Sequence, residues 1–221
     1  MKPRNQSWSW YIKQGVGRRL SRLGEMLNIH WLIYNPIHFM RFHELAQENA
    51  PGVVRTLAKI FPSARRYIDV GSGTGVFAAE VQRAGLKAVA CEHNVKGRKM
   101  ALKDGVDCRP FNLLNEPPAQ LDGSFDLAYC FEVAEHLPPE LGERLVKYLA
   151  GLAPIVVFTA AHPGQGGTGH INEQPKSYWI ERFEKAGMRH DPGLSQRVSS
   201  GFEAEGVPGE WMIQNVLVFV R

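Results

Sequence analysis

The stretch Tyr67-Ile-Asp-Val-Gly-Ser-Gly-Thr-Gly-Val-Phe-Ala-Ala-Glu80 decides the fold. The apolar run over 66–70 predicts a short buried strand, and the residues from 76 to 84 have the apolar spacing of a helix. Glycines at positions 71, 73 and 75 lie between these two segments. Because glycine has no Cβ, these positions allow a tight turn and the close approach of a ligand to the backbone. The stretch therefore predicts a strand, a ligand-binding loop and a helix.

The rest of the chain repeats this alternation of strands and helices. We expect further strands over 87–91, 106–109, 125–130, 155–160 and 212–220. We expect helices over 95–103, 138–150 and 177–186. Short strands that alternate with helices favour a mostly parallel sheet with helices on both faces. In such α/β folds ligands bind beyond the carboxyl ends of the strands, which is where the glycine loop would lie.

The composition excludes several classes of protein. With 44% hydrophobic residues in a chain of 221, a sizeable core can form, which excludes global disorder. The 3 cysteines are too few and odd in number for a disulfide scaffold, and no two form a CxxC zinc motif. No apolar run approaches the roughly 18 residues that a membrane span needs, and the N-terminus lacks a secretory signal pattern. We therefore expect a cytoplasmic protein without a membrane span.

The N-terminal segment differs from the rest of the chain in charge. Residues 1–66 hold 11 Lys+Arg against 3 Asp+Glu, a balance of +8, whereas the remainder carries −4. Apolar spacing predicts a helix from Ile12 to Trp31, a second over 37–48 and a third that starts at Pro51. Because isolated helices of this kind are marginal in water, they need a surface to cover. We expect 1–65 to form a helical cap on an α/β domain at 66–221.

The glycine loop disfavours a nicotinamide cofactor. A dinucleotide-binding loop has the pattern GxGxxG, which here would require glycine at position 76. That position holds Val76, and the third glycine comes one residue early. A branched side chain there opposes the close packing of helix and strand in a pyrophosphate cradle.

The stretch 67–80 resembles motif I of the class I S-adenosylmethionine-dependent methyltransferases, and the resemblance runs over about 66–183. In that family the loop after the first strand surrounds the methionine part of S-adenosylmethionine. The resemblance implies a Rossmann-like, seven-stranded, mostly parallel sheet. The residues that match the motif are Asp69, Gly71, Ser72, Gly73 and Gly75.

Two further positions carry the cofactor assignment. The second expected strand ends at Glu92, where the family places an acidic residue that binds both ribose hydroxyls. A carboxylate suits this task because it accepts two hydrogen bonds at once. Where the family has an Asp that binds adenine, followed by an apolar residue, this chain has Asn112 and Leu113. The amide oxygen of Asn112 can still accept a hydrogen bond, and Asp107 is a competing candidate.

The segment 123–138 resembles the fourth strand and the following loop of the family, which implies that Phe131 lies along the cofactor. A histidine, with a pKa near 6.5, is suited to deprotonating a hydroxyl at neutral pH. His136 is our first candidate for this catalytic role and His170 the second. Together with Glu132 and Glu135 they could instead bind a divalent metal, as a similar arrangement does in the small-RNA 2′-O-methyltransferases and in some ubiquinone-pathway O-methyltransferases. The sequence leaves this alternative open, and we assign no metal ligand from it.

The string His170-Ile-Asn-Glu-Gln-Pro, followed by Tyr178-Trp179, resembles a bacterial subgroup associated with small-molecule, sugar and natural-product pathways. We therefore expect methyl transfer from S-adenosylmethionine to a small molecule, with a hydroxyl oxygen as the acceptor atom. An RNA methyltransferase that uses the basic N-terminal segment is the first alternative. A non-catalytic module that only binds the cofactor is the second. The sequence does not indicate an oligomeric state.

Overall fold

The computed structural model describes residue 16 and residues 36–114 and 125–221. These residues form a seven-stranded sheet with the order β3-β2-β1-β4-β5-β7-β6. The strands are β1 (Arg66–Val70), β2 (Lys87–Glu92), β3 (Asp107–Pro110), β4 (Leu127–Phe131), β5 (Ile155–Thr159), β6 (Arg189–His190) and β7 (Leu217–Val220). All neighbours are parallel except that β7 runs antiparallel to both β5 and β6. The expected Rossmann-like, mostly parallel fold is confirmed.

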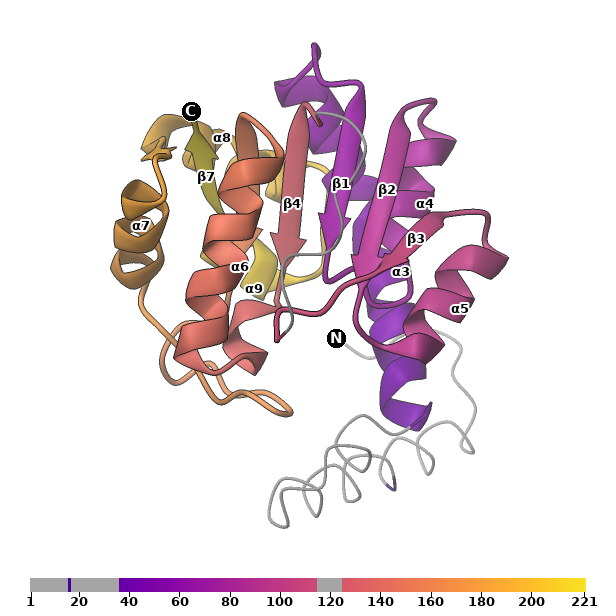
Figure 1. Cartoon of the computed structure of the whole chain (residues 1–221). Coiled ribbons are helices and arrows are strands. Elements are labelled where there is room, and N and C mark those ends of the chain that lie inside the picture. Colours follow the sequence, from indigo (N-terminus) through magenta and orange to yellow (C-terminus); the bar gives the residue numbers. More distant parts are fainter. Residues whose placement is uncertain (1–15, 17–35, 115–124) are drawn as a thin grey trace.

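Helices cover both faces of the sheet, with α6 in front of it and α3 and α4 behind it in Figure 1. The helices are α3 (Pro36–Ile60), α4 (Val76–Arg83), α5 (Val95–Lys103), α6 (Pro139–Leu152), α7 (Lys176–Lys185), α8 (Pro192–Ala204) and α9 (Glu210–Asn215). One hydrophobic core joins the sheet to α3, α4 and α8 through residues such as Leu57 and Phe202. The other joins it to α6 and α7 through Leu149, Trp179 and Phe183. Two such layers hold the strand ends, and the loops that follow them, in fixed positions.

The helix α3 corrects one prediction. We expected one helix over 37–48 and another from Pro51, but a single helix continues through Pro51. Proline removes one backbone N–H donor from a helix, and here the burial of Val53, Val54 and Leu57 in the core outweighs that loss.

The same helix packs against α4 and α8. Its His43 also reaches the glycine loop, with Nδ1 2.9 Å from Oγ1 of Thr74. The predicted helix from Ile12 to Trp31 lies outside the described residues except for Val16, which is helical and exposed. The division into a helical cap at 1–65 and an α/β domain at 66–221 therefore stays a prediction.

The C-terminal part differs from the prediction as well. The segment 212–220, expected to be one strand, begins within α9 and forms a strand only over β7. The sequence analysis also missed α8 and β6. The two-residue strand β6 is too short for any alternation pattern, and α8 contains two glycines and three serines, which weaken a helical signal. Among the described residues, no helix is long and apolar enough to cross a membrane.

Candidate active site

The glycine loop joins the carboxyl end of β1 to the start of α4. Gly71, Gly73 and Gly75 have φ angles of 78°, 55° and 77°, a region that residues with a side chain rarely adopt. The backbone N–H groups of Gly71 and Ser72 donate to the carbonyl oxygen of Cys91, which fixes the loop to the end of β2. A Cβ at Gly73 would meet no atom within 4 Å, so the loop is open on that side. The conformation therefore requires glycine and leaves space beside the backbone.

Glu92, at the end of β2, binds this loop directly. Its Oε2 accepts the N–H of Gly73 at 2.7 Å and its Oε1 accepts the N–H of Asn94 at 2.6 Å. Burial raises the pKa of Glu92, and the two N–H donors oppose that shift. Each carboxylate oxygen has two lone pairs, so both can accept another hydrogen bond. The geometry is compatible with the ribose-binding role, which stays a prediction.

Gly97 in α5 was not among the predicted site residues. A Cβ at this position would lie 2.2 Å from the carbonyl oxygen of Gly73 and 3.1 Å from Cγ of Glu92. Asn94 precedes the helix, and its side chain accepts the N–H of Lys96 and so caps the first turn. The first turn of α5 therefore packs directly against the glycine loop, and only glycine fits at position 97. A single glycine within a predicted helix was the one available signal.

Asp69 lies beneath the loop and is buried within β1. Burial raises its pKa well above the usual value, and the neighbouring carboxylate of Glu92 raises it further. The nearby Tyr129 hydroxyl and the backbone of Ala78 oppose this shift. In the sheet register Asp69 is paired with Tyr129 of β4. Asp69 thus connects the central strands to the first turn of α4.

The residues expected to bind adenine lie in the turn after β3. The Oδ1 of Asn112 accepts the N–H of Leu114 at 3.0 Å, which closes a turn after β3. Asn112 and Leu113 are half-buried, so both remain accessible from one side. Asp107 is the first residue of β3, away from the carboxyl ends of the strands, and it forms an ion pair with Arg109. The structure therefore favours Asn112 over Asp107, and its contact with adenine stays a prediction.

The end of β4 combines aromatic packing with a strained residue. The ring of Phe131 stacks on Tyr129 with centroids 5.1 Å apart and meets the edge of Phe77 at 5.5 Å. The next residue, Glu132, has a φ of 54°, the one positive φ of a non-glycine residue in the described parts of the chain. Its N–H donates to the carbonyl and hydroxyl oxygens of Thr159, which hold it in this conformation. Such strain is concentrated at functional sites.

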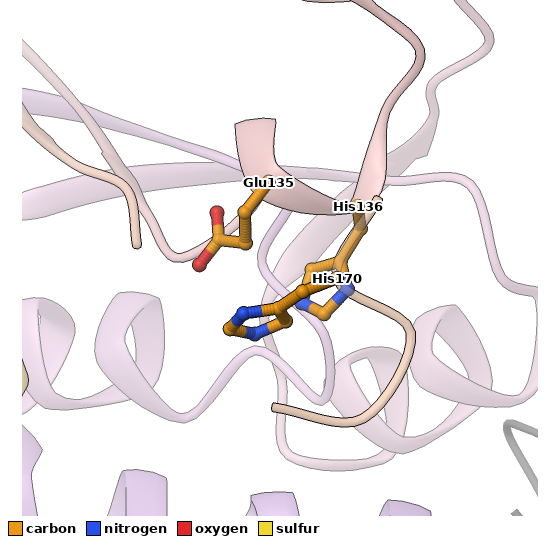
Figure 2. Close-up of side chains that lie close together, drawn as sticks. All are labelled: Glu135, His136 and His170. Carbon is orange, nitrogen blue, oxygen red and sulfur yellow. The ribbon is translucent and has the colours of Figure 1, made fainter. Parts of the chain in front are cut away.

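Two predicted catalytic residues, His136 and His170, come together with Glu135 beyond β4. Glu135 and His136 lie in the short helix η1 (Ala134–His136), and His170 lies in the long loop between β5 and α7. One potential ligand atom from each residue lies within 4.8 Å of the other two (Figure 2). The two imidazole rings meet edge to face, with centroids 4.9 Å apart. The sequence analysis proposed catalysis by His136 and His170 and named Glu135 only in the metal alternative, and the fold brings the three side chains into one cluster.

Glu135 is fully buried, and neither of its carboxylate oxygens has a hydrogen-bond partner among the described residues. Burial raises its pKa well above the usual value, and the nearby carboxyl group of Glu132 raises it further. The Oε2 atom of Glu132 accepts the side-chain amide N–H of Gln165 at 3.3 Å. An unpartnered buried carboxylate beside another one is costly, so it indicates a site with a chemical task.

Both imidazoles are oriented through Nδ1. The Nδ1–H of His136 donates to the carbonyl oxygen of Gly169 at 3.1 Å, and that of His170 donates to Oε1 of Glu173 at 2.9 Å. Partial burial opposes a low pKa for Glu173, but the hydrogen bonds from His170, Gly164 and Gly166 lower it on balance. In both rings Nε2 is therefore the nitrogen that carries the lone pair.

Backbone bonds hold the loop of His170 against η1. The N–H groups of Ile171 and Asn172 both donate to the carbonyl oxygen of Glu135, at 2.9 and 3.0 Å. The N–H of Gln174 donates to the carbonyl oxygen of Ala161 at the end of β5. The sequence analysis named Glu173 only as part of the string 170–175 and missed that it organises this loop.

Comparisons with known proteins identify the family. A family model described as "Methyltransferase domain" matches residues 41–200, which is more than half of the chain. No curated protein matches the chain in sequence.

Many solved structures share the fold. A TehB-like SAM-dependent methyltransferase from Corynebacterium glutamicum has a TM-score of 0.62 at 16% identity, covering 85% of this chain and 100% of its own. Magnesium protoporphyrin IX methyltransferase from Synechocystis, with bound SAH, has a TM-score of 0.59 at 16% identity, covering 89% and 99%. CalS10, a SAM-bound amino pentose methyltransferase from Micromonospora echinaspora, has a TM-score of 0.54 at 15% identity, covering 78% and 89%.

Proposed function

The chain belongs to the methyltransferase domain family, and we propose that it transfers the methyl group of S-adenosylmethionine to a hydroxyl oxygen of a small molecule. The observation that carries the proposal is the cluster of Glu135, His136 and His170. The cluster lies beyond β4, which pairs with β1, the strand that leads into the glycine loop. Parallel strands bring both features to one edge of the sheet.

The residues at the glycine loop fit the cofactor. Gly73 leaves open space beside the backbone, and Glu92 presents two carboxylate oxygens from the next strand. We assign the loop 71–75 to the methionine part, Glu92 to the ribose hydroxyls and Asn112 with Leu113 to the adenine. Phe131 would lie along the cofactor at the end of β4. When bound, the cofactor supplies a methyl group already activated on a cationic sulfonium.

The task left to the protein is to position the acceptor and to remove its proton. Hydrogen bonding to Gly169 and Glu173 makes Nε2 the basic nitrogen of His136 and of His170. Either Nε2 can take the proton of an acceptor hydroxyl, which makes the oxygen a better nucleophile. A positioned general base typically contributes about 10²–10⁴-fold in rate.

The acceptor class is part of the proposal. The amino pentose methyltransferase that shares this fold acts on a sugar, which supports a small hydroxylated acceptor in a biosynthetic pathway. The basic N-terminal segment keeps an RNA acceptor as the alternative, and its residues before α3, other than Val16, lie outside the described part of the chain. A cytoplasmic location stays a prediction.

The test is methyl transfer by the full-length chain to a panel of hydroxylated sugars and natural products and, in parallel, to RNA. We expect transfer to at least one small molecule, with loss of at least about 10²-fold in rate when both His136 and His170 are replaced by Asn. His162→Asn is the matched control, because His162 lies in the same loop but outside the cluster. Transfer to RNA alone would favour the first alternative. Binding of S-adenosylmethionine without transfer to any acceptor would favour a non-catalytic module.

A further inference from the structure

We propose that Glu132 and Glu135 form a binding site for a primary ammonium group, so that the acceptor is a small amino alcohol such as an amino sugar. The inference rests on the proposed function for the chemistry of methyl transfer, and it adds the charge and the class of the acceptor. The ammonium site itself stands on the two carboxyl groups and on their surroundings.

Three buried carboxylate oxygens just beyond β4 have no hydrogen-bond partner among the described residues. They are Oε1 of Glu132 and both oxygens of Glu135, a residue that is itself fully buried. A primary ammonium group carries three N–H donors and one positive charge. It therefore offers one donor to each of these oxygens, whereas a hydroxyl group has a single donor and no charge.

The two carboxyl groups also lack a positive charge that would offset their own. None of the ion pairs among the described residues involves Glu132 or Glu135. A buried carboxylate is unfavourable unless a cation compensates it. In the proposed function His136 and His170 act as bases, so their rings are neutral when the acceptor binds. We therefore assign the compensating charge to the acceptor.

The place of Glu132 in the fold suits a cationic acceptor. Its φ of 54° is unfavourable, and the carbonyl and hydroxyl oxygens of Thr159 hold it by accepting its N–H. Glu132 directly follows β4, the neighbour of β1, at the edge of the sheet where the cationic sulfonium of the cofactor is expected. Two positive charges at close range repel each other, and a carboxylate beside them offsets that repulsion.

Gln165 occupies part of this site in the free protein. Its side-chain amide N–H donates to Oε2 of Glu132 at 3.3 Å, and its Oε1 accepts the amide N–H of Asn215 at 2.8 Å. The bond to Glu132 is long, and its donor is neutral. The loop 164–169 contains four glycines, which allow its backbone to rearrange as an acceptor enters. An ammonium group that displaces the amide of Gln165 gains a charge-assisted hydrogen bond, which is the stronger kind.

The distance from Glu135 to the histidines limits the shape of the acceptor. One carboxylate oxygen of Glu135 lies within 4.8 Å of a ring nitrogen of His136 and of one of His170 (Figure 2). This short distance favours an acceptor whose amine and hydroxyl are on neighbouring carbon atoms. An imidazole Nε2 takes the hydroxyl proton, the oxygen bonds to the methyl carbon, and the bond from that carbon to sulfur breaks. The products are a methyl ether that keeps its ammonium group and S-adenosylhomocysteine.

The site is tested with the full-length protein and with sets of pentoses and hexoses that differ in one substituent. Each set contains a 2-amino or 3-amino sugar and its hydroxy, N-acetyl and N,N,N-trimethyl counterparts. Calorimetry in the presence of S-adenosylhomocysteine gives the affinity, and transfer of a radiolabelled methyl group gives kcat/KM. We expect at least one primary amine to bind about 10-fold or more tightly than its three counterparts, because it alone combines the charge with three N–H donors.

Two variants connect this preference to the carboxyl groups. Glu132→Gln and Glu135→Gln keep the shape of the side chain and remove its charge. Each should weaken binding of the primary amine about 10–100-fold and leave the affinity for S-adenosylhomocysteine unchanged, which also shows that the fold is intact. Glu140→Gln is the matched control, because Glu140 is exposed in the first turn of α6, and it should bind the amine like wild type.

The outcomes separate this proposal from the proposed function. Primary amines that bind no more tightly than their hydroxy counterparts, or that bind equally to wild type and to both Gln variants, would overturn the ammonium site. The comparison among sugars needs no variant, so it decides the proposal even where a variant does not fold. Methyl transfer to nitrogen, located by mass spectrometry, would support the ammonium site and overturn the hydroxyl acceptor. Failure of the wild type to bind S-adenosylhomocysteine would overturn the proposed function and leave calorimetry with the amine alone to decide the site.

Discussion

Replacement of Gly97 by alanine should disturb the cofactor site through a single methyl group. The added Cβ would lie 2.2 Å from the carbonyl oxygen of Gly73, and real Cβ atoms keep a distance of at least about 3.0 Å. The loop or the start of α5 must therefore move by about 0.8 Å. Because the opposing atom belongs to the backbone, no rotation of a side chain relieves the contact.

The effect of this shift on cofactor affinity and on the free energy of unfolding can be estimated. It would separate the N–H of Gly73 from the carboxylate of Glu92, which now lie 2.7 Å apart. Loss of a hydrogen bond to a charged group costs about 1.5–3 kcal/mol, so a displaced Glu92 should weaken the binding of S-adenosylhomocysteine about 10–100-fold. Overpacking typically costs about 1–3 kcal/mol, which offsets or exceeds the roughly 1 kcal/mol that alanine gains over glycine within a helix. The variant should therefore not be more stable than wild type.

Gly151→Ala provides the control. Gly151 is also a helical glycine, in α6, but a Cβ there would meet no atom within 4 Å. This variant should bind the cofactor like wild type and gain up to about 1 kcal/mol in free energy of unfolding. Calorimetry with S-adenosylhomocysteine and urea unfolding measure both quantities. If Gly97→Ala keeps wild-type affinity and gains as much stability as Gly151→Ala, the argument from close contact is wrong.

Three further predictions concern acidic residues. Glu92→Ala should weaken binding of S-adenosylmethionine by about 1.5–3 kcal/mol, since a charged acceptor is lost, and an unchanged affinity in calorimetry would remove Glu92 from the site. Burial raises the pKa of Asp69, so this carboxyl group binds a proton more tightly in the folded protein than in the unfolded chain. Asp69 therefore lowers the free energy of unfolding as the pH rises above its pKa in the unfolded chain, about 3.9. Asp69→Asn should therefore lessen the loss of stability as the pH rises above about 4, and an unaltered slope of stability against pH in urea unfolding would contradict this. Glu132→Gly should raise the free energy of unfolding by about 1 kcal/mol more than Glu132→Ala does, because only glycine relieves a φ of 54°; equal values for the two variants would show that the backbone is not strained.

Much of the fold could be predicted because its patterns are local. The strand at 66–70 and the helix at 95–103 have their expected bounds, since each carries its own apolar spacing and ending. The helix α3 could not be predicted as one element, because its continuity through Pro51 depends on burial against α4 and α8. The strand β6 exists only because β7 lies beside it. Elements that depend on distant partners leave no pattern in the chain itself.

The candidate site shows the same division between local and distant causes. The glycine loop could be named from sequence because three glycines follow a strand there, and Glu92 could be named because it stands where the resembling family places an acidic residue. The residue types at 135, 136 and 170 indicated their chemistry, but the distance between η1 and His170 depends on how the loop after β5 closes. That closure is set by the carbonyl oxygen of Glu135, which accepts two N–H groups of the loop, and by Glu173, which accepts two more and orients His170. Because the carbonyl belongs to the backbone, side-chain substitution at Glu135 removes a potential ligand while the loop keeps its anchor. Substitution at Glu173 does the reverse, so the two positions separate the chemistry of the cluster from its assembly.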